Sequence, residues 1–180
     1  MENNYRSKEE WYFSLYLEEL VINGYVDKWW YEPKAFILSE PVTYKWIKET
    51  QLKTKIRKEN KESTFLRGHE YTPDFVLRWT DLGKYTLWST TGLTRPFYAD
   101  SKGYSFVDTK GVFNRHESSV KFRINQKWLW DKLGIYVQEI VPSKLFAKTF
   151  TPNRYLRTDG DTKKRSFKWK AVSLKEYFDK

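Results

Sequence analysis

Two short segments of the chain each carry one aspartate in apolar surroundings, and the second also carries a lysine. The stretch 71–77 contains Asp74, and the stretch 104–111 contains Asp108 followed two residues later by Lys110. Side chains two apart on a strand project from the same face, so Asp108 and Lys110 should point together, and an aspartate from a neighbouring strand can join them. Two converging carboxylates repel each other unless a divalent cation lies between them, and hard oxygen ligands of this kind suit Mg²⁺. The chemistry predicted is metal-assisted hydrolysis of a phosphodiester, in which the lysine orients water or stabilises charge on the phosphate.

A helix that begins after Ser7 precedes both aspartates. The run Ser7-Lys8-Glu9-Glu10 has the pattern of a capping box, with Ser7 as N-cap and Glu10 at N3. Apolar residues then recur on one face until Gly24, at Phe13, Leu17, Leu20 and Val21. The box gives Glu10 a structural role, but a carboxylate at the head of this helix can also reach the end of the sheet that carries the two aspartates. Two interpretations of Glu10 are therefore open: it is a residue of the site, or it only caps the helix. Glu9 is the alternative carboxylate for the site.

A second helix is expected over 120–132, ending at Gly134, with Phe122, Leu129 and Leu133 on its apolar side. A strand over 135–141 follows it. Because strand, helix and strand with short links form a crossover, the strands 104–110 and 135–141 should be parallel neighbours.

The remaining elements complete an α/β (α+β) fold in a single domain, with a central mixed sheet flanked by helices. Further strands are expected over 25–31, 35–38, 75–79 and 85–89, and short helices over 144–148 and 174–178. Residues 1–142 would form the core, with insertions near 39–67 and 90–103, and residues 143–180 a basic extension packed on the same domain.

The composition favours an anionic partner. The chain has 33 Lys and Arg against 23 Asp and Glu, a net charge of +10, together with 9 Trp, 13 Tyr and 12 Phe. Basic residues attract polyanions and interleaved rings can stack on bases, which favours nucleic acid. Two stretches fit this description. The run 163–170 is either a binding surface or a solvated basic edge strand, and 39–67 is either a solvated charged hairpin or loop or an arm along DNA.

Several classes of function are disfavoured by what the sequence lacks. The absence of cysteine excludes disulfides, cysteine-based zinc sites and thiol catalysis, and two histidines make a histidine-rich metal site improbable. The N-terminus has no apolar signal core and no segment has the length of a membrane span, so we expect no membrane association and a cytoplasmic location.

The pattern of these residues resembles the PD-(D/E)xK nuclease superfamily, with Pro73-Asp74 as the first part and Asp108-Thr109-Lys110 as the second. Together with the capped helix before them and the helix ending at Gly134, they resemble a phage family of small Holliday-junction-resolvase-like nucleases over most of residues 7–141. They are also similar to proteins of crAss-like phages. The insertions look longer than this family needs, and the part beyond residue 142 has no counterpart in it.

The resemblance implies a restriction-endonuclease-like αβββαβ core and a catalytic set. Asp74 and Asp108 would hold Mg²⁺ or Mn²⁺, with the backbone carbonyl of Thr109 as a third ligand. Lys110 would position the attacking water or stabilise the pentacovalent phosphate. Glu10 would contact the metal through water or bind a second ion.

The resemblance also implies a partner and a setting. Arg123 and Lys127, one helical turn apart, would bind the phosphate backbone of DNA. The protein would be a phage-encoded, Mg-dependent DNA endonuclease acting on branched, replicating or packaging DNA in the host cytoplasm, as a homodimer for paired cuts. The alternative is a non-catalytic DNA-binding or virion-associated phage protein on the same fold. A restriction-type enzyme would need a base-reading element that the sequence does not reveal.

Overall fold

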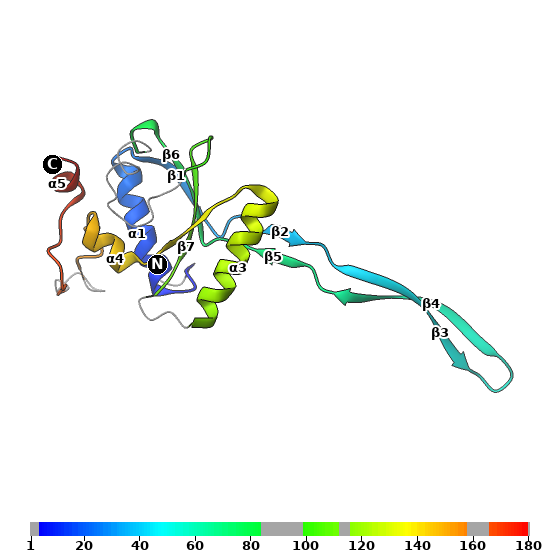
Figure 1. The fold of residues 1–180 in the computed structure, drawn as a ribbon. Helices are drawn as coiled ribbons and strands as arrows, with labels where there is room; N and C mark the ends of the chain where they lie inside the picture. The colour runs from blue at the N-terminus through cyan, green and yellow to red at the C-terminus, as the bar shows by residue number, and fades with distance from the viewer. Residues whose placement is uncertain (1–3, 84–98, 112–115, 158–165, 180) are drawn as a thin grey trace. The chain divides into compact units, whose positions relative to one another are not determined.

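The structure, a computed structural model, describes residues 4–83, 99–111, 116–157 and 166–179 (Figure 1). Its contacts divide the chain into two compact units, one formed by Met1–Pro33 with Pro73–Lys180 and the other by Lys34–Thr72. The strand expected over 85–89 and most of the 90–103 insertion lie outside the described residues. Within the described residues, no helix is both long and apolar enough to cross a membrane.

The first unit is built on a four-stranded sheet. Its elements are α1 (Lys8–Ile22), β1 (Val26–Tyr31), β6 (Phe75–Trp79), β7 (Tyr104–Thr109), α3 (His116–Leu133), β8 (Val137–Ile140), α4 (Pro142–Lys148) and α5 (Leu174–Phe178). The strand order is β1-β6-β7-β8, with antiparallel pairing except between β7 and β8, which are parallel. The mixed sheet, the αβββαβ order and the predicted parallel crossover are confirmed. Figure 1 shows α1 and α4 on one side of β7 and α3 on the other.

The capping box predicted at the start of α1 is present. The Ser7 hydroxyl accepts a hydrogen bond from the Glu10 backbone N–H at 3.1 Å, and the Glu10 carboxylate accepts one from the Ser7 N–H at 3.3 Å. At the other end Gly24 has a φ of 77°, and the Gly24 and Tyr25 N–H groups bond back to Val21 and Leu20. This is a Schellman ending, for which glycine is suited because it adopts positive φ without a Cβ clash.

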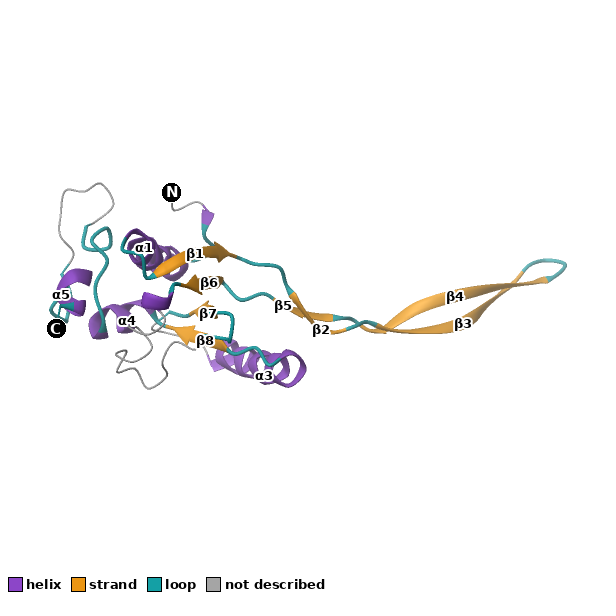
Figure 2. Ribbon diagram, turned by 90° about the horizontal axis from the view of Figure 1, so that it is seen from above, coloured by secondary structure: helices purple, strands orange, loops and turns teal. Residues whose placement is uncertain are grey.

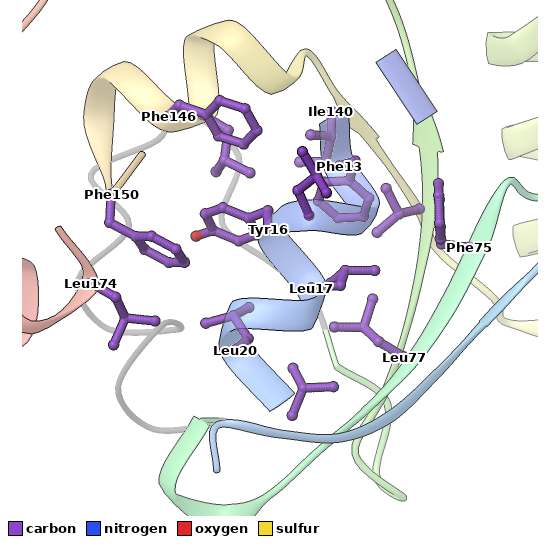
Figure 3. Packing of buried hydrophobic residues seen from close by; sticks show 14 of the residues in the cluster. Phe13, Tyr16, Leu17, Leu20, Phe75, Leu77, Ile140, Phe146, Phe150 and Leu174 are labelled. Atoms are coloured by element: carbon purple, nitrogen blue, oxygen red, sulfur yellow. The ribbon is translucent and has the colours of Figure 1, made fainter. Parts of the chain in front are cut away.

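The core is rich in aromatic side chains that lie between α1 and the C-terminal part of the chain (Figure 3). Tyr16 stacks on Phe146 and Phe150 with ring centroids 5.6 and 4.3 Å apart. Phe13, Leu17 and Leu20 are buried as predicted, and Val21 is half-buried. More of the helix surface is buried than the predicted stripe, since Ser14, Leu15 and Tyr16 are also buried. The reason is that residues of the sheet and residues of the C-terminal part both pack against α1.

The basic stretch 163–170 is described only over residues 166–170, and these do not form the edge strand that was one of the two interpretations of it. Phe167 stacks on Tyr155 with centroids 5.5 Å apart, and the Trp169 indole N–H donates to Thr151 at 3.2 Å. The two rings are partly buried against the core cluster. The two rings therefore pack against the core, while Lys168 and Lys170 are exposed to solvent.

α3 is longer than predicted, since it begins at His116 instead of residue 120. Phe122 and Leu129 are buried as expected, but the prediction for Leu133 is wrong, because its side chain is 49% exposed. Gln126 holds the helix against the following strand. Its side chain accepts from the Val137 N–H at 2.6 Å and donates to a backbone carbonyl of the link at 3.3 Å.

The second unit consists of antiparallel pairs. β2 (Phe36–Ser39) pairs with β5 (His69–Tyr71), and β3 (Val42–Gln51) pairs with β4 (Ile56–Leu66). Figure 2 shows the two pairs as successive parts of one two-stranded ribbon. Residues 39–67 therefore contain a charged hairpin, a shape that both the solvated hairpin and the arm along DNA would have.

The first prediction concerns the N-terminal cap. Replacing Glu10 with alanine removes one half of the capping box and the acceptor for two further donors, the Arg6 N–H and the Tyr31 hydroxyl. We expect Glu10→Ala to lower the free energy of unfolding by roughly 1–2 kcal/mol. Glu9→Ala, which leaves the box intact, should cost only a few tenths of a kcal/mol. Urea denaturation of both variants checks this, and equal effects would contradict it.

Candidate metal and catalytic site

The register of β6 and β7 brings Asp74 and Asp108 together. Phe75 lies opposite Val107 in this antiparallel pair. Asp74 precedes Phe75 and Asp108 follows Val107, so the register continued by one residue sets the two aspartates opposite each other on one face. Asp74 lies just before the first residue of β6, at the end of the sheet, where its neighbour Pro73 needs no N–H for the ladder.

Thr109 fixes the Asp74 carboxylate. Its backbone N–H and its hydroxyl both donate to Oδ2 of Asp74, at 2.6 and 2.8 Å. Among the described residues, none donates a hydrogen bond to the other oxygen, Oδ1. The sequence suggested only the carbonyl of Thr109 as a ligand, so this use of its N–H and side chain was missed. The only feature of the sequence that could have indicated these hydrogen bonds is the position of Thr109 next to Asp108.

Asp74 is a buried carboxylate close to other negative charges. Burial raises the pKa of Asp74 to about 7, and the negative charges of Asp108 and, less strongly, Glu10 add to the rise. The hydrogen bonds from Thr109 oppose it because they favour the ionised form. A proton on Asp74, or a cation bound beside it, would relieve this repulsion.

Lys110 lies beside Asp108, as the i, i+2 spacing predicts. Its Nζ forms an ion pair with Oδ1 of Asp108, and both side chains are mostly buried, at 17% and 8% exposure. The same Nζ lies 5.4 Å from the centre of the Phe122 ring on α3, within range of a cation–π contact. The lysine is thus held from two sides, and its amine lies next to the Asp108 carboxylate.

Both glutamates at the head of α1 come near this end of the sheet. Glu10 is buried, and its Oε2 accepts from the Tyr31 hydroxyl at 2.6 Å and the Arg6 N–H at 2.8 Å, in addition to closing the capping box. Its charge also reaches Asp74. Glu9 is half-buried, and its Oε1 lies 3.4 Å from where a Cβ on Gly111 would be, just beyond Lys110. Glu10 is therefore committed to structural hydrogen bonds, which leaves Glu9 as an open alternative.

Arg123 and Lys127 are both exposed on α3, the helix that carries Phe122. Their spacing of four residues places them on one face of the helix. Neither belongs to an ion pair with another described residue. The two cations are therefore accessible to an anionic partner.

A further carboxylate was not singled out in the sequence. Glu139 of β8 lies next to Asp108 in the parallel ladder and is half-buried. Residues in register on neighbouring strands project from the same face. The predicted crossover fixed which strands are neighbours but could not fix their register, so this pairing was not foreseeable.

The donors present fit a Mg²⁺ or Mn²⁺ ion. In the described part of the chain, no group of three or more Asp, Glu, His or Cys side chains is arranged to hold a metal. Mg²⁺ is commonly bound by one or two carboxylates, with water and substrate phosphate completing its shell. Asp74 and Asp108 meet that need, and the raised pKa of Asp74 is the mark of repulsion and burial that a cation would relieve.

Comparisons of the chain with protein-family models, with curated proteins and with solved structures give no match.

Proposed function

We propose that the protein is a Mg²⁺- or Mn²⁺-dependent DNA endonuclease of the PD-(D/E)xK type. The observation that carries the proposal is the meeting of Asp74, Asp108 and Lys110 at one end of the sheet, where burial and neighbouring charge raise the pKa of Asp74 to about 7. A buried carboxylate with a raised pKa, close to a second carboxylate and a lysine, is typical of a site for chemistry. The net charge of +10 supports a polyanionic substrate.

The roles follow from the positions of the side chains. Asp74 and Asp108, with the Thr109 carbonyl, would hold the ion, which supplies polarisation of the phosphate and acidification of a bound water. Thr109 keeps the Asp74 carboxylate oriented through its two hydrogen bonds. Lys110 would leave its ion pair with Asp108 to orient the attacking water or to stabilise charge on the phosphate. Glu10, or Glu9 in its place, would contact the ion through water or bind a second ion.

Cleavage of a DNA panel tests the proposal. Four-way junction, flap, duplex and single strand are incubated with Mg²⁺, Mn²⁺, Ca²⁺ or EDTA, with Asp108→Asn as the inactive control. We expect cutting with Mg²⁺ and Mn²⁺ only, preferring branched DNA, and a homodimer in light scattering. Cutting by Asp108→Asn, or in EDTA, would contradict the proposal.

The second candidate is a non-catalytic DNA-binding or virion-associated phage protein. The ion pair of Lys110 with Asp108 favours it, since a buried pair of this kind is also found in purely structural settings. Binding to every DNA of the panel without cutting any would select this candidate. A phage origin and a host-cytoplasmic location belong to the proposal in both cases.

The next prediction concerns the phosphate contacts of α3. If Arg123 and Lys127 each touch a phosphate, Arg123→Ala/Lys127→Ala should flatten the slope of log affinity against log salt by roughly two units, since each contact contributes about −0.9. The matched control is Lys144→Ala/Lys148→Ala, an exposed pair with the same spacing on α4. Anisotropy titrations at several salt concentrations measure the slope. Equal slopes for the two double variants would remove α3 from the binding surface.

A further inference from the structure

The ribbon formed by β3 and β4 is exposed along its whole length. All ten residues of β3 and nine of the eleven in β4 are exposed. A two-stranded ribbon without a packed face is only marginally stable by itself in water. Its exposed side chains nevertheless include the large apolar residues Tyr44, Trp46 and Ile47. Exposed apolar side chains that lie close together are typical of interaction sites. The ribbon therefore has the character of a surface that a partner covers.

The two faces of the ribbon differ in charge. Residues paired across the antiparallel ladder share a face, so the register assigns each side chain. The first face, here called the basic face, consists of Tyr44, Trp46, Lys48, Thr50, Arg57, Glu59, Lys61 and Ser63. The opposite face consists of Thr43, Lys45, Ile47, Glu49, Gln51, Ile56, Lys58, Asn60, Glu62 and Thr64. The basic face has three cations against one carboxylate, and the opposite face has two of each.

The single carboxylate of the basic face is already neutralised within that face. Glu59 pairs with Arg57 at 2.8 Å and with Lys61 at 3.0 Å, and the hydrogen bond from Lys61 lowers the pKa of Glu59. Lys48 of the same face, and Lys53 and Lys55 in the turn at the tip, form no ion pair with a described residue. Over 42–66 the ribbon has seven Lys and Arg against three Glu, a net charge of +4. The uncompensated charge is therefore concentrated on one face and at the tip.

We propose that the basic face and the tip of the ribbon bind double-stranded DNA. The major groove of a duplex is about 12 Å wide and admits a two-stranded ribbon. Ten residues of β3 span about 33 Å, close to one turn of the double helix. The cations of the basic face come from both strands, so they can meet phosphates on both walls of the groove. A second copy of the chain fits less well, since two ribbons of charge +4 repel each other.

The aromatic residues of the basic face suit the same partner. Trp46 is 42% exposed, and its indole N–H donates to Ser63 on the neighbouring strand at 2.9 Å, which restrains the ring. Tyr44 lies two residues away on the same face. Rings held in this way offer apolar contacts to sugars and to thymine methyl groups between the phosphate-binding lysines.

The inference rests on the proposed function in taking DNA as the polyanion, but it requires neither metal nor cleavage. Binding is measured in EDTA, by anisotropy of a labelled 30-base-pair duplex between 50 and 300 mM salt. Lys48→Gln/Lys61→Gln removes two charges from the basic face. Lys45→Gln/Lys58→Gln is the matched control on the opposite face, and in each variant one lysine is ion-paired and the other is not. A third variant, Lys53→Gln/Lys55→Gln, lies in the turn and leaves the ladder untouched.

We expect the basic-face and tip variants each to weaken duplex binding about tenfold or more at 100 mM salt and to flatten the salt slope by nearly two units. The opposite-face control should change affinity by less than threefold. The proposal would be overturned if the two face variants had equal effects, or if the basic-face and tip variants had none. It would also be overturned if these variants weakened binding to a 30-base single strand but not to the duplex. Loss of a dimer in light scattering with duplex affinity unchanged would also overturn it, in favour of self-association. Because no cleavage is scored, failure of the endonuclease proposal leaves this result interpretable.

Discussion

Lys110→Ala is expected to abolish DNA cleavage while DNA affinity stays within about threefold of the unmodified protein. A group that acts on the transition state contributes to the rate, whereas one phosphate contact among many is a small part of the binding energy. The loss should be about 10²–10³-fold or more, since removal of a single charge-stabilising group costs about 10²–10³-fold. Single-turnover cleavage gives the rate, and anisotropy in Ca²⁺ gives the affinity. Lys144→Ala, an exposed lysine on α4, should cut normally.

The ion pair with Asp108 complicates this variant, because a buried carboxylate that loses its partner destabilises the fold. Asp108→Asn/Lys110→Met removes both charges and should melt near the temperature of the unmodified protein. It should be as inactive as Lys110→Ala. Cleavage at the normal rate by either folded variant would show that Lys110 has no part in the chemistry.

The second large effect concerns pH and Asp74. Its pKa of about 7 in the folded protein exceeds that of an aspartate in an unfolded chain, about 4. Below pH 4 both states hold the proton. Between pH 4 and 7 the unfolded state loses the proton while the folded state keeps it. The free energy of unfolding therefore falls as pH rises through this window, and the contribution of Asp74 becomes constant above pH 7.

Asp74→Asn removes this dependence and keeps an oxygen for the Thr109 hydrogen bonds. Without divalent ions, we expect the stability of the variant relative to the unmodified protein to rise by on the order of 2–3 kcal/mol between pH 5 and 8. Urea denaturation at each pH measures it. Asp81→Asn, at an exposed position, reports the general effect of removing one negative charge. If the unmodified protein and Asp74→Asn showed the same pH dependence, the pKa of Asp74 would not be raised in the folded protein.

The parts of the fold that local chemistry determines could be predicted from the sequence. The Ser7 and Glu10 capping box, the glycine end of α1 and the last helix, Leu174–Phe178, are each encoded within a few residues. The crossover between β7 and β8 followed from the order of elements alone. Asp108 and Lys110 were placed together correctly because the spacing of two is a property of any strand.

What the sequence could not supply depends on register and on tertiary contact. Glu139 lies next to Asp108 only because of how β8 aligns with β7, which no local pattern reveals. Trp169 was assigned to a possible binding surface because lysines flank it, but its indole N–H donates to Thr151 and its partly buried ring packs against the core cluster. The difference in charge between the two faces of the ribbon likewise appears only once the pairing of β3 with β4 is known.

Binding of Mn²⁺ tests the central claim most directly, because it asks whether Asp74 and Asp108 share a cation. Calorimetric titration is carried out with the unmodified protein, Asp74→Asn and Asp108→Asn, each alone and with a duplex containing phosphorothioate linkages that resist hydrolysis. We expect the unmodified protein to bind Mn²⁺, more tightly with DNA present, and each variant to lose at least about tenfold in affinity. Equal binding by all three proteins, or negligible binding by the unmodified protein with DNA present, would contradict the account.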